Sequence, residues 1–242
     1  MRLRDVEKRI FECSKPEYKG NVCPVAKKFK ENKGERPIPE AYLGNPKAKF
    51  MIIGINPGQS ENYLCGDFEV YQSQIRGFLK DPNKWTRAKG GWVYDDVIKI
   101  FRYPPREKDG VIITNLVHCP TPSWGQKIKK SDQWYLADEK KEEAIKLCNP
   151  FCFDIIGKVD PELILLHGPD AVKFFSDHYG WSVKDPKSMD IIGDIKTGDG
   201  RKYVLSQHLV RLIFCEKNQG AWKRLKEAAT KLKKGKVFRE RK

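Results

Sequence analysis

The sequence predicts an α/β protein, with a three-layer α/β/α arrangement around a central four-stranded parallel sheet. Short continuous apolar runs are typical of strands buried on both faces, and stretches with helical spacing of apolar residues lie between them. This alternation is characteristic of a parallel sheet with helices on both faces. The expected strands cover residues 50–55, 111–116, 162–167 and 202–206. The expected helices cover residues 70–79, 93–101, 137–159, 170–178 and 219–232.

The length of the chain indicates one domain. A chain of 242 residues can bury one sizeable α/β core, so we expect a single domain over residues 1–242. Its ends are expected to carry an N-terminal segment of about residues 1–45 and a basic helix and tail at about residues 219–242. Residues 120–138, which include Pro, Gly, two Trp and several Lys, are expected to form a long loop.

The charge of the chain favours a polyanionic partner. Lys and Arg number 47 against 32 Asp and Glu, which gives a formal net charge of +15. Nucleic acid is therefore the leading partner, although part of the excess lies in the tail at residues 223–242. The N-terminus has no apolar signal region, and the longest apolar runs, at residues 50–53 and 163–166, are too short to cross a bilayer. We expect an intracellular, cytoplasmic or nuclear monomer with no membrane association.

Polar residues and glycines follow three of the expected strands. The first strand leads into Gly54-Ile-Asn-Pro-Gly58, in which two glycines allow close approach of the backbone to a ligand and the proline stiffens the turn. Asn115 lies at the end of the second strand, and His208 follows the fourth. Because carboxyl ends of parallel strands meet at one sheet edge, we expect these groups to converge. No Gly-x-Gly-x-x-Gly follows the first strand, so no nucleotide cofactor is expected.

These segments resemble the uracil-DNA glycosylase superfamily. The turn at residues 54–58 is similar to the first motif of the mismatch-specific and single-strand-selective branches. Thr114-Asn-Leu-Val-His-Cys-Pro120 and Glu143-Ala-Ile-Lys-Leu-Cys-Asn-Pro150 are similar to segments of the iron-sulfur, family 4-like branch. The resemblance spans roughly residues 13–212 and includes the strand after residue 159.

The resemblance implies a monofunctional DNA glycosylase. Such an enzyme hydrolyses the N-glycosidic bond of uracil, or of a related deaminated base, and leaves an abasic site for base excision repair. Its substrate is DNA containing a deaminated or mismatched base, and the target nucleotide must leave the stack because C1′ is inaccessible in a duplex. No Schiff-base lysine is evident, so we expect no lyase activity. Two alternatives stay open: a preference for hypoxanthine, xanthine or mismatched thymine, and a non-catalytic nucleic-acid-binding protein of the same fold.

The resemblance also assigns roles to three polar side chains. Asn115 would read uracil, because an amide oxygen accepts from N3–H while its NH₂ donates to O4. The alternative for Asn115 is a cap on the following turn. Asn56 would orient the attacking water, since an amide is too weak a base to deprotonate it early. His208 would donate a hydrogen bond to O2 of the departing base.

Further residues of the expected pocket come from the same motifs. Phe68, in Gly66-Asp-Phe68, would stack on the flipped base, and a core role is its alternative. The segment His208-Leu-Val-Arg-Leu212 departs from the family's His-Pro-Ser second motif. Arg211 or Leu212 would fill the gap left by the flipped base or hold a phosphate. The remaining residues expected to contact the base are Gly54, Ile55, Pro57 and Gly58.

Seven cysteines without an export signal argue against a disulfide framework and favour metal binding. The resemblance implies a structural [4Fe-4S] cluster that pins the N-terminal segment, and four thiolates would also suit zinc. Nine residues separate the first two expected ligands, and Cys152, one helical turn past the fourth, is an alternative ligand. Cys65 and Cys215 are expected to be free. The expected ligands are Cys13, Cys23, Cys119 and Cys148.

Overall fold

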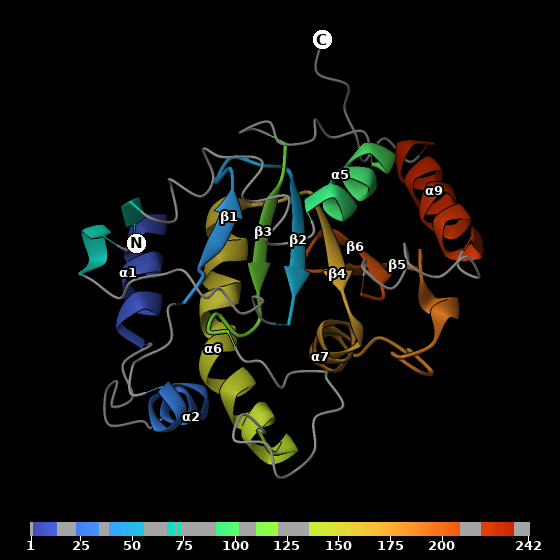
Figure 1. Ribbon diagram of the computed structural model, residues 1–242. Helices are drawn as coiled ribbons and strands as arrows, with labels where there is room; N and C mark the ends of the chain where they lie inside the picture. Colours follow the sequence, from blue (N-terminus) through green and yellow to red (C-terminus); the bar gives the residue numbers. More distant parts are fainter. Residues whose placement is uncertain are drawn as a thin grey trace. The chain divides into compact units, whose positions relative to one another are not determined.

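The computed structural model describes residues 2–13, 23–33, 39–55, 67–70, 72–73, 91–101, 110–120, 136–208 and 219–234 (Figure 1). The chain divides into two compact units. The first comprises Met1–Leu43, Asn56–Lys89 and Thr114–Val159, and the second comprises Gly44–Ile55, Gly90–Ile113 and Asp160–Lys242. Each unit therefore combines segments that are far apart in the sequence.

The order of elements along the chain is that of an α/β protein. The strands are β1 (Tyr42–Gly44), β2 (Phe50–Gly54), β3 (Ile112–Asn115), β4 (Leu163–His167), β5 (Ile195–Gly198) and β6 (Arg201–Ser206). The helices are α1 (Leu3–Cys13), α2 (Pro24–Lys33), α5 (Gly91–Ile100), α6 (Asp138–Val159), α7 (Pro169–Tyr179), the short 3₁₀ helix η2 (Met189–Ile191) and α9 (Gln219–Lys234). The predicted α/β class is confirmed, and the element order is consistent with the three-layer α/β/α fold.

The sheet is larger than the four parallel strands that the sequence predicts. Its strand order is β1-β3-β2-β4-β6-β5. All four predicted strands are present, and β2, β4 and β6 pair in parallel. The additional strand β5 pairs antiparallel with β6, so the sheet is mixed. Neither extra strand carries a long apolar run, because β1 has three residues and β5 buries one of its four.

Four of the predicted helices are confirmed as α5, α6, α7 and α9. Of the predicted helix 70–79, the structure describes residues 70, 72 and 73, which are helical. The helices α1 and α2 within the N-terminal segment were not predicted. Most of the expected loop at residues 120–138 and the end of the basic tail lie outside the described residues. No helix within the described ranges has the length and apolar character that crossing a membrane requires.

In the first unit, α1 and α2 both pack against α6. Val6, Ile10 and Phe11 form the buried face of α1. Arg9 on α1 forms an ion pair of 2.8 Å with Asp154 on α6 and lies over the ring of Phe151. These contacts hold α1 and α2 against one long helix, α6.

In the second unit, β2 and β4 form an entirely apolar centre. Every residue of β2 is buried, as are the first four residues of β4. Helix α7 packs on β4 and β6, where Phe175 lies 5.6 Å from Tyr203 between ring centroids. Helix α7 ends at Gly180, whose left-handed backbone (φ 67°) lets its N–H bond to Ser176. Helices α5 and α9 contact each other.

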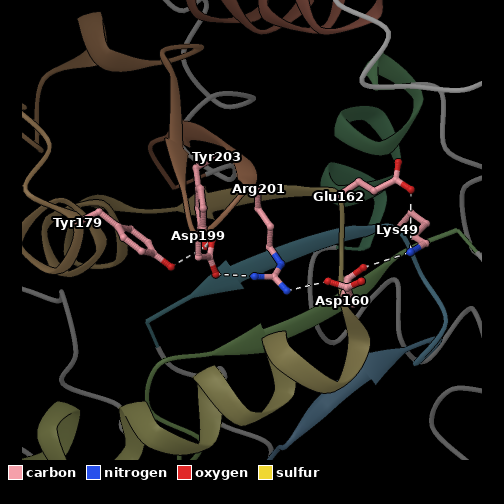
Figure 2. A network of polar contacts seen from close by, with 7 residues as sticks. All are labelled: Lys49, Asp160, Glu162, Tyr179, Asp199, Arg201 and Tyr203. Atoms are coloured by element: carbon pink, nitrogen blue, oxygen red, sulfur yellow. Dashed lines mark hydrogen bonds and ion pairs between the residues drawn. The ribbon is translucent and has the colours of Figure 1, made fainter.

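A polar network joins the amino ends of the strands in the second unit (Figure 2). Arg201, the first residue of β6, donates to Asp160 at 2.7 Å and to Asp199 at 2.5 Å. Asp160 also accepts from Lys49 through its backbone carbonyl at 3.3 Å. Asp199 accepts from the hydroxyl of Tyr203 at 3.0 Å. The network therefore lies at the amino ends of the strands, whereas His208 follows the carboxyl end of β6.

Candidate active site

The carboxyl ends of β4 and β6 are neighbours in the second unit. His167 pairs with Ser206 in the parallel register, and the backbone N–H of Gly168 donates to the carbonyl of Ser206 at 3.1 Å. His208 follows β6 two residues later, at the point where β4 passes into α7. This is the edge at which α/β sheets gather their ligands. The structure thus places His208 where a catalytic group of this fold class is expected.

The imidazole of His208 lies against the turn after β4. The rings of His167 and His208 are 5.3 Å apart between centroids and nearly perpendicular, at 85°. A Cβ added to Gly168 would lie 3.0 Å from Cε1 of His208 and 3.2 Å from each ring nitrogen. Burial, with a smaller contribution from His208, lowers the pKa of His167 to about 3. His167 is therefore neutral at physiological pH, and it adds no charge beside His208.

The backbone that leads into His208 is anchored by the side chain before it. Gln207 is 2% exposed, and its Nε2 donates to the carbonyls of Pro186 at 2.6 Å and of Ser188 at 3.1 Å. The hydroxyl of Ser206 donates to the carbonyl of Gln207 at 3.2 Å. Sequence reasoning assigned no role to His167, Gly168 or Gln207. The available signal was that two neighbouring strands end in His-Gly and Ser-Gln-His.

Asn115 ends β3 and belongs to the first unit. It is 6% exposed, and its side chain makes no hydrogen bond within the described residues. The turn cap that was the alternative for Asn115 is thus not formed there. By contrast, Thr114 beside it donates to the carbonyl of Ala41 at 2.7 Å. The role of Asn115 in reading uracil and its approach to His208 stay predictions.

Other predicted site residues have different surroundings. Gly54 ends β2, and Ile55 after it is 5% exposed. Phe68 is half-buried and packs on α1, with its ring centroid 5.6 Å from that of Phe11 and with the guanidinium of Arg4 over it at 6.0 Å. These contacts favour the packing role that was the alternative for Phe68. The other predicted site residues, Asn56, Pro57, Gly58, Arg211 and Leu212, lie outside the described residues, as do Cys65 and Cys215.

Three predicted metal ligands gather in the first unit, where α1 ends, α2 begins and both pack on α6. Burial raises the pKa of the Cys13 thiol to about 12, and Cys23 adds to this shift. Burial also raises the pKa of Cys148, to which both Cys23 and Cys13 contribute. The three thiols are therefore within electrostatic range of one another. Burial also raises the pKa of Cys23, and the backbone amides of Ala26 and Val25, at the start of α2, offset part of this shift.

The fourth predicted ligand, Cys119, is buried beside this group. The backbone amide of His118, the residue before it, hydrogen-bonds to the sulfur of Cys148. Cys152 is also fully buried, and burial alone raises its pKa to about 12. Among the described residues, no three His, Cys, Asp or Glu side chains are arranged to hold a metal ion. Cys13, Cys23 and Cys148 are thus neighbours, Cys119 directly follows the residue that bonds to Cys148, and the cluster stays a prediction.

His118 itself is fixed within the first unit. Its Nδ1 lies 3.0 Å from the carbonyl oxygen of Glu40, which can only accept, so Nδ1 carries the proton. The backbone N–H of Glu40 donates in return to the carbonyl of His118 at 2.7 Å. Burial lowers the pKa of His118 to about 4. These bonds position the segment that carries Asn115 and Cys119.

Comparison with known proteins identifies the family. A search of curated proteins found no match. The family model described as the uracil DNA glycosylase superfamily matches residues 41–228, which include β2, β3, β4 and β6 with their carboxyl ends. The match covers most of the chain and includes Asn115 and His208. The chain therefore belongs to the uracil-DNA glycosylase superfamily.

Proposed function

We propose that the protein is a monofunctional DNA glycosylase that removes uracil from DNA and leaves an abasic site. The observation that carries this proposal is the family match over residues 41–228, which indicates DNA glycosylase activity. The net charge of +15 supports a DNA substrate, since Lys and Arg bind phosphates and release counterions. A target base must be flipped into a pocket before the enzyme reaches its glycosidic bond.

His208 and Asn115 would act on the flipped base. As the glycosidic bond breaks, negative charge develops on the base, and a fixed donor toward O2 stabilises it. The imidazole of His208 can supply this donor, because the contacts of Gly168 and Gln207 hold it at the sheet edge. The amide of Asn115 supports uracil as the substrate, because it matches the N3–H and O4 pattern that cytosine reverses.

The attacking water is assigned to Asn56. An amide at this position orients the water without deprotonating it, so bond cleavage would precede attack and positive charge would develop on the sugar. In the sequence, Asn56 comes two residues after the end of β2, and residues that follow such strands commonly bind ligands in α/β proteins. No covalent bond to the enzyme is needed in this route.

We also propose that the protein belongs to the iron-sulfur branch. Cys13, Cys23, Cys119 and Cys148 would hold a [4Fe-4S] cluster, which supplies rigidity because base excision transfers no electrons. The mutual electrostatic effects of Cys13, Cys23 and Cys148 support this set. In a cluster each thiolate binds a different iron, so the sulfurs lie further apart than around one zinc ion. That spacing is compatible with the lack of a single-ion site among the described residues.

We propose Cys148 rather than Cys152 as the ligand from α6. After burial, Cys23 and Cys13 contribute most to the raised pKa of Cys148, and Cys152 adds a smaller contribution. The amide of His118 also bonds to the sulfur of Cys148, as amides commonly do at metal-bound sulfurs. Cys152 behaves as a small apolar residue in the core of the first unit.

A single-turnover assay on oligonucleotides with uracil, hypoxanthine or a G:T mismatch tests the function, with alkali to cut abasic sites. We expect cleavage at uracil, and Asn115→Asp is expected to slow it by about 100-fold, because a carboxylate cannot donate to O4 and repels the developing anion. Preferred cleavage at hypoxanthine or G:T would reassign the substrate. Tight DNA binding without cleavage of any substrate would identify a non-catalytic protein.

A further inference from the structure

Gly168 has a backbone conformation that glycine alone adopts readily. It occupies the N-cap of α7 with φ 100° and ψ 157°. Helix N-caps favour Ser, Thr, Asp and Asn, whose side chains bond to the first free amides, yet α7 has no side-chain cap. Side-chain capping of α7 therefore does not explain why a glycine occupies position 168.

The space beside Gly168 is occupied by His208. A Cβ at Gly168 would be 3.0–3.2 Å from three atoms of the imidazole, which is closer than carbon atoms pack without displacement. A methyl group there would push the ring by a few tenths of an ångström. A larger side chain would occupy the space that the imidazole fills. The ring of His167 also contacts the ring of His208 and lies nearly perpendicular to it.

Hydrogen bonds hold the chain that directly precedes His208. The carbonyl of Ser206 is bonded to the N–H of Gly168, and Gln207 is held by two carbonyls from the segment before η2. The ring cannot follow a shift of the β4–α7 turn without breaking these bonds. The position of the imidazole is therefore restricted by the anchored backbone before it and by Gly168 and His167 beside it.

We propose that Gly168 and His167 are positioning residues for His208, Gly168 by its missing side chain and His167 by the edge-to-face contact of its ring. This inference rests on the proposed role of His208 in base excision. A donor toward the base O2 acts only from the correct place, and misplacement of a catalytic group by about 1 Å costs roughly 100-fold in rate. The first turn after β4 would thus contribute to catalysis without touching DNA.

The test uses the full-length protein with Gly168→Ala, His208→Ala and the double variant. Gly168→Ala is expected to lower the single-turnover rate on uracil DNA by about tenfold, because the methyl group shifts the ring by less than 1 Å. DNA affinity is expected to stay unchanged. In the His208→Ala background the same change is expected to cost nothing further, because the ring it displaces is absent.

Gly200→Ala is the matched control for backbone strain. Gly200 also has a positive φ, of 83°, but a Cβ there meets no atom within 4 Å. We expect it to keep the wild-type rate. His167→Phe is expected to keep most of the rate through its aromatic edge, while His167→Ala loses the contact and slows the reaction. Equal losses in both backgrounds for Gly168→Ala, or a wild-type rate for this variant, would overturn the proposal.

A spectroscopic measurement separates this inference from the proposed function. The imidazole signals of His208 in a proton–carbon NMR spectrum are expected to move in Gly168→Ala and to stay in place in Gly200→Ala. Unmoved signals in Gly168→Ala would refute the positioning role whether or not the protein excises uracil. Full activity of His208→Ala would instead contradict the role of His208 in the proposed function.

Discussion

His167 lies beside His208, and the burial of its imidazole also affects the stability of the protein. Its imidazole is neutral because burial lowers its pKa to about 3, whereas the same group titrates near pH 6.5 in an unfolded chain. Between these values the unfolded state binds a proton that the folded state excludes. Neutral His167 therefore costs no stability above about pH 6.5 and an increasing amount as the pH falls toward 3.

We predict that His167→Asn makes the stability of the protein less sensitive to acid. The free energy of unfolding of the wild type is expected to fall by up to about 1.4 kcal/mol per pH unit through this residue, and the variant lacks that contribution. Urea unfolding between about pH 7 and pH 5 measures the difference. His178→Asn, at an exposed position on α7, is the matched control. Parallel pH profiles for His167→Asn and the wild type would contradict the neutral state of His167.

The sequence motifs point to His208 and Asn115 as candidate site residues, but not to the residues that contact His208. The resemblance singled out polar residues at strand ends, each of which is visible within a short motif. The contacts of Gly168 and His167 with His208 depend on the register between β4 and β6, which are separated by more than thirty residues of sequence. A local motif carries no information on such a pairing. The positive φ of Gly168 is likewise a property of the folded turn.

At the scale of elements, helix α6 carries both the expected cluster ligand and its alternative. We predict that Cys148→Ser abolishes or strongly lowers the iron content of the purified protein, while Cys152→Ser keeps it. The two cysteines lie one helical turn apart and are both buried, so Cys152→Ser controls for loss of a buried thiol. Iron and zinc analysis with the visible absorption spectrum measures the result. Iron loss in Cys152→Ser alone would exchange the two assignments, and stoichiometric zinc without iron would exclude the cluster.

The network of Arg201 supports the opposite end of the same strands. Its side chain is 18% exposed and bonds to two carboxylates, so Arg201→Met leaves Asp160 and Asp199 without their partner. We predict a loss of about 2 kcal/mol in the free energy of unfolding with an unchanged single-turnover rate, because the network lies at the amino ends of the strands. Lys173→Met, which removes an exposed ion pair on α7, is expected to cost much less. A reduced rate in Arg201→Met at full folding would show that the two ends are coupled.

Among the elements that were not predicted from the sequence, β5, α1 and α2 all depend on tertiary contacts. Strand β5 is an edge strand with one buried residue, so it lacks the apolar run that revealed β2 and β4. It is formed by the turn at Asp199 and Gly200, both with positive φ, and by pairing with β6. Helices α1 and α2 pack against α6, so their stability depends on that tertiary packing. Length does not distinguish them from the predicted helices α5 and α7, which are equally short.

For the molecule as a whole, the central claim is that an α/β chain of this superfamily uses a basic surface and the carboxyl ends of its strands to excise uracil. The family match over residues 41–228 includes segments of both units. Excision of uracil with a water oriented by Asn56 would not depend on which metal the cysteines hold.

The most direct test is the single-turnover rate of uracil excision by the wild type and by Asn56→Ala, with DNA affinity measured in parallel. The account predicts cleavage of the uracil strand by the wild type and a loss of about 100-fold or more in the variant, with DNA affinity retained, because the water loses its fixed partner. Full activity of Asn56→Ala would contradict the assigned mechanism. An inactive wild type that still binds DNA would contradict the central claim itself.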